Sequence, residues 1–334
     1  MPFIKDIIKY NSLSIVGTEK NTGKTVCLNY ILNKLKNSGK RIAITSIGID
    51  GEGIDQVTNT HKPEIEVFEN MIFVTSEKHY NKKQAVSEIL DISEKQTSLG
   101  RLITAKTIIQ GKVLFSGPSD TVWLKEMIDK MPQFSVDLTI VDGALSRLSL
   151  GSPAVTESMI LTTGAALSAN ISQLIKKTKF IHNLILIPEY QSSINQELLK
   201  IEKGIWAIDS NGTINDLEIP TVFLLEQKKD KLFKFGNTIF VSGAITDNLL
   251  NFMRIQKQIE QIVLIVKDFT KIFVSPEAYN SYIKRGGKIF VLLRTKLIAV
   301  CVNPVSPQGF VLNSEELVYS LSESLQIPVY DIKK

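Results

Sequence analysis

The sequence predicts an α/β protein: a first domain with a mostly parallel, doubly wound sheet, followed by a smaller α/β domain. In the first half, short and nearly continuous apolar runs alternate with amphipathic stretches, as is typical of strands covered on both faces. After Pro188 the pattern changes, and β-rich runs surround the turn sequence SNG. A chain of 334 residues also favours about two domains. We therefore expect domains over residues 1–190 and 191–334.

Strand and helix signals place the elements of the first domain. The run LSIVG predicts the first strand, and residues 25–40 predict a helix that stops at Gly39. The apolar positions on one face of this helix are Leu28, Ile31, Leu32 and Leu35. Further strands are expected at RIAITSIG, MIFVTS, KVLFSG, LTIVDG, MILTTG and NLILIP, which are residues 41–48, 71–76, 112–117, 138–143, 159–164 and 183–188. Further helices are expected at residues 82–95, 121–131 and 169–181.

The second domain is expected to open with short antiparallel strands within residues 205–227. Strand-like and helix-like patterns then alternate again, at residues 237–253, 262–268, 270–275, 276–287, 288–294 and 296–302. Ser314, followed by Glu315 and Glu316, is expected to cap a final helix that ends near Leu325.

Composition and charge argue against several classes of function. The net charge is +5, but the lysines are dispersed among acidic residues, so we expect no nucleic-acid partner. The two cysteines, Cys27 and Cys301, form no disulfide framework, and Cys301 is expected to be buried packing. The three histidines, His61, His79 and His182, have no metal-ligand spacing. No apolar run approaches the roughly 18 residues of a membrane span, so we expect a cytoplasmic protein.

The stretch GTEKNTGKT, residues 17–25, has the composition of a phosphate-binding loop. Gly17 stands one place earlier than in the common G-x-x-x-x-G-K-[ST] pattern, and the stretch lies between an expected strand and helix. Glycine lets successive backbone N–H groups turn inward, and these groups bind phosphate oxygens together with the helix N-terminus. Lys24 is expected to reach the β- and γ-phosphates, and Thr25 to bind Mg²⁺. The predicted nucleotide-binding residues are Gly17, Thr18, Asn21, Thr22, Gly23, Lys24 and Thr25.

A nucleotide site of this kind needs an acidic residue for the metal. The run DLTIVDG ends in Asp142, which follows apolar residues as in a Walker B strand. Thr25 and Asp142 are therefore the predicted metal ligands. A turn residue at the strand end is the simpler alternative for Asp142.

Other polar residues are weaker candidates. Asp50 follows the second expected strand, at the sheet edge where such folds bind ligands, and could order the metal or the attacking water. Lys24 and Asp50 are therefore the candidate catalytic residues, with Asp55 a weaker one. Arg147 could meet developing phosphate charge or form a surface ion pair. Ser119 or Asp120 is expected to cap the next helix.

A lysine five residues before the main lysine marks some ATPases, in which it crosses a dimer interface. Here Glu19 holds that position and Lys20 is one residue away. A homodimer is one assembly compatible with this pattern, but the sequence does not assign Lys20 that role.

The first domain resembles dethiobiotin synthetase. The resemblance rests on G-T-[acid]-x-x-x-G-K-T and on the strand end VDGA, residues 141–144. It implies a P-loop NTPase fold and a preference for ATP, and no NKxD-type guanine motif occurs at the later strand ends. The sequence SIGIDGEGID lacks the Lys-Pro pattern expected after the second strand of that family.

A second resemblance covers nearly the whole chain. The segments SIVGTEKNTGKTVCLNYI, DGALSRLSLGSPAVTESMILTTGAALSANI and NPVSPQGF…IPVYDI are similar to the reactivase subunit family associated with lysine 5,6-aminomutase. Members accompany this cobalamin- and pyridoxal-phosphate-dependent enzyme of lysine fermentation. The resemblance implies ATP and Mg²⁺ as cofactors, the aminomutase and a companion reactivase subunit as partners, and a role in exchanging damaged cobalamin.

Three functions are compatible with these observations. The first is an ATP-dependent accessory protein in which the γ-phosphate holds loops that hydrolysis releases. The second is an ATP-dependent ligase or kinase of the dethiobiotin synthetase-like class, for which Lys62 and Arg147 are candidate substrate contacts. The third is a nucleotide-binding subunit without turnover. A glutamine amidotransferase is not expected, because no histidine follows His182 to serve Cys301.

Overall fold

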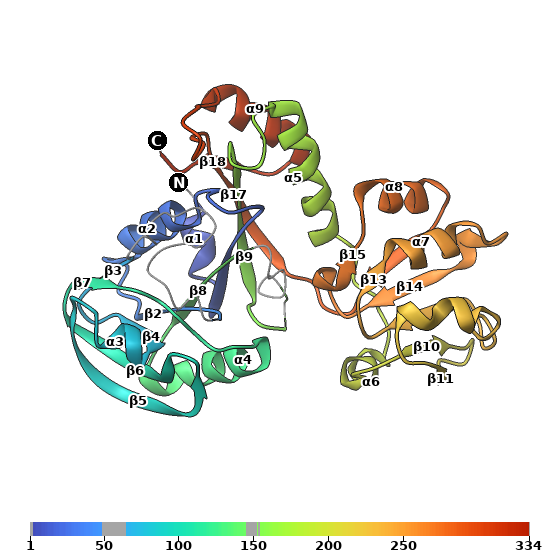
Figure 1. Cartoon of the computed structure of the whole chain (residues 1–334), viewed down its shortest axis with the longest axis horizontal. Helices are drawn as coiled ribbons and strands as arrows, with labels where there is room; N and C mark the ends of the chain where they lie inside the picture. The colour runs from blue at the N-terminus through green and yellow to red at the C-terminus, as the bar shows by residue number, and fades with distance from the viewer. Residues whose placement is uncertain (1–2, 49–64, 145–151, 153, 334) are drawn as a thin grey trace. The chain divides into compact units, whose positions relative to one another are not determined.

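The computed structural model describes residues 3–48, 65–144, 152 and 154–333. It is an α/β protein that divides into two compact units (Figure 1). Unit 1 comprises Met1–Lys179 and Thr295–Lys334, and unit 2 comprises Phe180–Arg294. Within the described residues, no helix is both long and apolar enough to cross a membrane.

Unit 1 is built on a large, mostly parallel sheet. Among the described residues its nine strands lie in the order β18-β17-β9-β1-β8-β2-β4-β6-β5. All neighbouring pairs are parallel except β4–β6 and β5–β6. The strands are β1 (Ser12–Gly17), β2 (Ile42–Ser46), β4 (Ile72–Ser76), β5 (Val86–Thr97), β6 (Gly100–Ile109), β8 (Leu138–Ala144), β9 (Ser158–Gly164), β17 (Lys296–Asn303) and β18 (Val329–Asp331).

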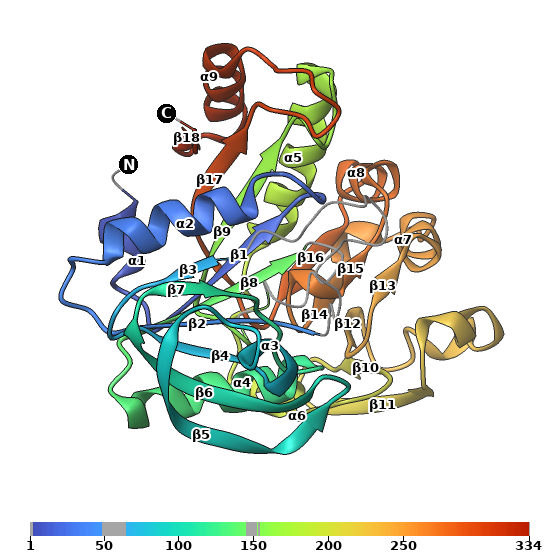
Figure 2. The same cartoon turned by 60° about the vertical axis from the view of Figure 1, so that its left-hand side comes forward.

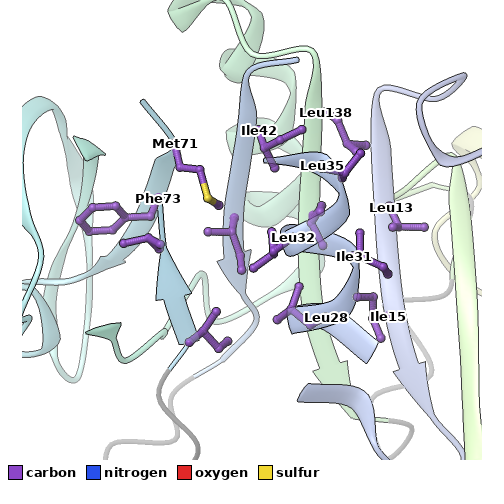
Figure 3. Close-up of a cluster of buried hydrophobic side chains, with 14 of the residues drawn as sticks. Leu13, Ile15, Leu28, Ile31, Leu32, Leu35, Ile42, Met71, Phe73 and Leu138 are labelled. Atoms are coloured by element: carbon purple, nitrogen blue, oxygen red, sulfur yellow. The ribbon is translucent and has the colours of Figure 1, made fainter. Parts of the chain in front are cut away.

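The central strands pair through their backbones and are covered by the apolar face of α2 (Lys24–Leu35). Figure 3 shows Ile31 of α2 beside Leu13 and Ile15 of β1, and Leu28 and Leu32 belong to the same buried cluster. The four apolar positions predicted for this helix are all buried, which confirms the expected periodicity. This packing holds the beginning of α2 against the end of β1.

Three other helices of unit 1 lie close to the predicted positions: α4 (Thr121–Lys130), α5 (Ile171–Ile185, which continues into unit 2) and α9 (Ser314–Leu325). The short helices α1 (Ile4–Ile7) and α3 (Glu77–Tyr80) were not predicted. The cap of α9 is Asn313, whose side-chain oxygen accepts from the backbone N–H groups of Glu315 and Glu316. The expected cap, Ser314, instead donates its hydroxyl to Asp331. The prediction was therefore one residue late.

Asp120 caps α4, as predicted, and its carboxylate accepts from the backbone N–H of Trp123 at 2.8 Å. We expect Asp120→Ala to lower the free energy of unfolding by about 1 kcal/mol. That hydrogen bond holds the pKa of Asp120 below its ordinary value. The stabilisation is therefore present above the unfolded-state pKa and is lost as the pH falls through the lower folded-state pKa. Urea unfolding at pH 7 and at acidic pH measures both effects.

Asp129→Ala, on the same helix, is the matched control for the cap. Asp129 is exposed and pairs only with Lys125 at the helix surface, at 2.7 Å. Such a pair contributes roughly 0.3–0.5 kcal/mol. Equal losses from both substitutions would contradict the capping role of Asp120.

The prediction of a helix over residues 82–95 was wrong, because this segment contains strand β5 at the edge of the sheet (Figure 2). Val86, Ile89 and Ile92 are spaced as on a helix. Their partners on β6 are Ile109, Ala105 and Ile103, which all lie on one face of that strand. Register shifts after Val86 and Ile89 let a three-residue spacing stay on one face. The bulges in β5 therefore give a strand the three-residue spacing of apolar side chains that is typical of a helix.

Two other expected strands also differ. NLILIP is not a strand, because α5 extends to Ile185. KVLFSG contributes only to β7 (Gly111–Val113), which pairs outside the large sheet with β3 (Ile65–Val67).

Unit 2 contains a separate five-stranded sheet in the order β11-β10-β12-β14-β16. The expected hairpin around SNG is present, since β10 and β11 are antiparallel, while β12, β14 and β16 are parallel neighbours. The strands are β10 (Ile205–Ile208), β11 (Ile214–Ile219), β12 (Thr238–Val241), β14 (Val263–Val266) and β16 (Lys288–Val291), with β13 (Ile245–Thr246) and β15 (Ile272–Phe273) paired apart. The helices are α6 (Asn195–Lys200), α7 (Asp247–Arg254) and α8 (Pro276–Lys284).

The division of the chain differs from the expected domains 1–190 and 191–334. Residues 295–334 belong to unit 1, where β17 pairs with β9 and β18 pairs with β17. The second unit is therefore an insertion into the first. This return of the chain also brings C-terminal residues to the candidate site.

Candidate functional site

The loop between β1 and α2, residues 17–24, lies at the carboxyl edge of the large sheet. Strand β1 is flanked by the parallel strands β8 and β9, so all three end on the same side. Gly17 is the last residue of β1 and Lys24 is the first of α2. We call this segment loop 17–24. The backbone N–H groups that begin α2 have no helical partner of their own and suit an anion.

The backbone of loop 17–24 turns through two left-handed residues, Asn21 with φ of 61° and Gly23 with φ of 94°. Gly23 is also packed against the C-terminal segment. A Cβ atom there would lie 2.4 Å from Cδ1 of Ile332 and 2.8 Å from Cβ of Asn303. Only glycine fits this combination of torsion and space.

The ammonium group of Lys24 lies over the end of β1. Its Nζ donates to the backbone oxygen of Glu19 at 3.5 Å, and a Cβ on Gly17 would lie 2.9 Å from it. Burial lowers the pKa of Lys24, while the carboxylates of Asp142 and Glu19 oppose that shift. The loop therefore holds a partly desolvated cation close to an acidic side chain.

Asp142 lies on β8, directly beside the loop. It is opposite Ile15 of β1 and Ser46 of β2 in the strand register. The Ser46 hydroxyl donates to the backbone oxygen of Asp142 at 3.2 Å, which fixes this part of the strand. Thr25, the second residue of α2, is half-buried at the same edge. The two predicted metal ligands are thus oxygen donors on neighbouring elements, and Mg²⁺ prefers oxygen ligands.

Threonines at the end of β9 support the loop, and sequence reasoning did not single them out. The N–H of Thr18 donates to the backbone oxygen of Thr162 at 2.8 Å. The Thr22 hydroxyl donates to the backbone oxygen of Glu19 at 2.9 Å and lies 3.2 Å from the Thr162 hydroxyl. Through these hydrogen bonds, Thr18 and Thr22 stabilise the loop itself. The signal available was the TTG sequence at a strand end next to the loop.

Asn303, at the end of β17, is a second residue that sequence reasoning missed. Its Nδ2 donates to the backbone oxygen of Asn21 at 3.4 Å, and its backbone oxygen accepts from Ala165 N–H. It also forms part of the wall against Gly23. A residue 282 positions away in sequence thus supports the left-handed turn of the loop.

Five residues named from the sequence lie outside the described part of the chain. These are Asp50, Asp55, His61, Lys62 and Arg147. Of the remaining candidates, Lys20 is exposed in the loop and Asp120 caps α4. His79 and His182 are buried in the separate helices α3 and α5.

The two cysteines are both buried free thiols, as expected for Cys301. A hydrogen bond with Cys301, together with burial, raises the pKa of the Cys27 thiol well above its ordinary value. Such a thiol is inert as a nucleophile at neutral pH. Cys27 and Cys301 therefore pack α2 against β17 beneath the loop.

Within the described ranges, no group of three His, Cys, Asp or Glu side chains is arranged to hold a metal ion. Comparison of the chain with family models, with curated proteins and with solved structures finds no match.

Proposed function

We propose that loop 17–24 binds the phosphates of Mg-ATP, as in a P-loop NTPase. The observation that carries this proposal is the position of Lys24. Its partly desolvated ammonium group lies between the carbonyl of Glu19 and the end of β1, near Asp142. An ammonium group beside backbone N–H groups at a helix N-terminus suits a polyphosphate.

The described residues then have separate roles. Lys24 binds the β- and γ-phosphate oxygens, and the backbone from Asn21 to Lys24 surrounds them. Thr25 and Asp142 hold Mg²⁺, which neutralises phosphate charge when bound. Because Gly23 and Asn303 fix the turn, the loop is shaped before the nucleotide arrives.

We further propose that the chain is the ATP-binding accessory subunit of a lysine 5,6-aminomutase reactivation system. The resemblance of three long segments to that family supports this role. The second unit, inserted between Lys179 and Thr295, is a compact body of its own, and it is the part of the chain that we propose binds the partner. ATP binding and hydrolysis would drive the exchange of damaged cobalamin in the partner enzyme.

Calorimetric titration tests the nucleotide site. Mg-ATP and Mg-GTP are titrated into the wild type, into Asp142→Asn and into the control Asp137→Asn. Asp137 precedes β8 at its opposite end, where it accepts from Arg41 N–H and pairs with Lys40. We expect Mg-ATP to bind the wild type and Asp137→Asn equally, and Asp142→Asn roughly tenfold or more weakly. Absence of binding to the wild type would contradict the nucleotide site.

A reactivation assay tests the accessory role. Inactivated aminomutase is incubated with cobalamin, the companion subunit, this protein and ATP, with Asp142→Asn in parallel. We expect activity to return only with the wild type and ATP. Formation of ADP that depends on a small metabolite, without any protein partner, would instead favour the ligase or kinase alternative.

A further inference from the structure

Three buried threonine hydroxyls form a continuous chain from loop 17–24 to helix α5. The Thr18 hydroxyl donates to the Thr163 hydroxyl at 3.2 Å, and the Thr163 hydroxyl lies 2.9 Å from that of Thr178. Thr18 is 5% exposed, and Thr163 and Thr178 are fully buried. Each residue comes from a different element: the loop, the end of β9 and the middle of α5.

The row of three hydroxyl groups depends on its middle residue, Thr163. A hydroxyl has one proton to donate and two lone pairs to accept with, so Thr163 can serve both neighbours at once. Since water does not reach fully buried atoms, loss of the Thr163 hydroxyl leaves its neighbours without a replacement. The position of the loop and the position of α5 are therefore linked through one side chain.

Helix α5 is continuous on both sides of Thr178. The segment Ile171–Ile185 contains no proline or glycine, so it has no sequence cause for a kink. The division between the units falls within this helix, after Lys179.

We expect nucleotide binding to move Thr18, the first of the three threonines. Lys24 Nζ donates to the Glu19 carbonyl at 3.5 Å, and a phosphate would compete with that carbonyl for the ammonium group. The Thr22 hydroxyl holds the same Glu19 carbonyl, so a change there reaches the whole turn. Thr18, which directly precedes Glu19, carries the change to Thr163.

We propose that Thr163 and Thr178 are positioning residues that couple the state of loop 17–24 to helix α5. This inference rests on the proposed nucleotide site and names its regulation.

Hydrogen exchange of the full chain tests the coupling. In the wild type, we expect Mg-ATP to slow amide exchange in residues 171–185 by about tenfold. In the double variant Thr163→Val with Thr178→Val, we expect Mg-ATP affinity to change less than about threefold while the protection of α5 is lost. Thr139→Val, at the buried amino end of β8, is the matched control and is expected to behave like the wild type. Full protection of α5 in the double variant would overturn the proposal.

A double-mutant cycle measured without nucleotide tests the coupling of the hydroxyl groups independently of the proposed nucleotide site. Thr18→Val and Thr178→Val are compared singly and together, with exchange measured in the loop and in α5. Coupled hydroxyls give effects that are not additive, whereas independent structural losses add. Thr178→Ser keeps the hydroxyl and is expected to restore wild-type exchange. Additive effects overturn the coupling, and non-additive effects in a protein that binds no Mg-ATP refute the nucleotide site alone.

Discussion

A chain shortened to residues 1–190 is expected not to fold, although it contains the whole loop 17–24. Residues 295–334 would be missing, and with them β17, which pairs with β9 along most of its length. The side chains lost from the core include Val300, Val302, Leu317 and Leu321, each fully buried. At roughly 1.5–3 kcal/mol for each such side chain, their loss is comparable to a total stability of about 5–15 kcal/mol.

Two further shortened chains test whether the structure divides into two units that fold independently. Residues 180–294 have their own sheet and their own core cluster, so this segment is expected to melt cooperatively by itself. Unit 1 with residues 180–294 replaced by a flexible Gly-Ser linker is expected to melt cooperatively as well. Circular dichroism and thermal melting of the three chains measure this. A cooperative transition in the 1–190 chain would contradict the division of the structure.

Local patterns predicted much of unit 1, because those patterns depend on neighbours in sequence. The burial of Leu28, Ile31, Leu32 and Leu35 follows from a 3.6-residue period on one helix. The strands LSIVG, LTIVDG and MILTTG are continuous apolar runs, which parallel strands buried on both faces require. Loop 17–24 and Asp142 also came together as expected, since parallel strands end at one edge.

Non-local pairing is what the sequence did not reveal. The run KLIAVCV is as apolar as the strands of unit 2, and no local signal says that it pairs with β9 instead. Asn303 was missed for the same reason, because its role depends on that pairing. The helix predicted over residues 82–95 was wrong for a different reason, because bulges in β5 give a strand the spacing of a helix.

Lys24→Met is expected to abolish the stabilisation that Mg-ATP gives and, at the same time, to stabilise the nucleotide-free protein. Burial is the largest cause of the lowered pKa of Lys24, and it outweighs the attraction of Asp142. Methionine keeps the length of the side chain and removes the charge. We therefore expect the free energy of unfolding without nucleotide to rise. A saturating ligand stabilises the folded state by roughly 2–4 kcal/mol, and this stabilisation would be absent in Lys24→Met.

The pH dependence of this gain identifies its cause. At neutral pH, both the folded and the unfolded wild type hold the Lys24 proton, so the cost of burying the charge is fully present. As the pH rises through the lowered folded-state pKa, the folded protein loses the proton first, and the cost fades. The advantage of Lys24→Met over the wild type should therefore shrink between pH 7 and pH values near the ordinary lysine pKa.

Lys34→Met is the matched control, because Lys34 is exposed on the same helix. It is expected to leave both the melting temperature and the Mg-ATP response close to those of the wild type. Thermal melting with and without Mg-ATP at several pH values measures all of these effects. If Lys24→Met destabilises the nucleotide-free protein, the ammonium group supports the loop structurally, and its position beside Asp142 is an ion pair. If the variant is stabilised and still responds to Mg-ATP, the nucleotide binds without Lys24, and the loop is not its phosphate site.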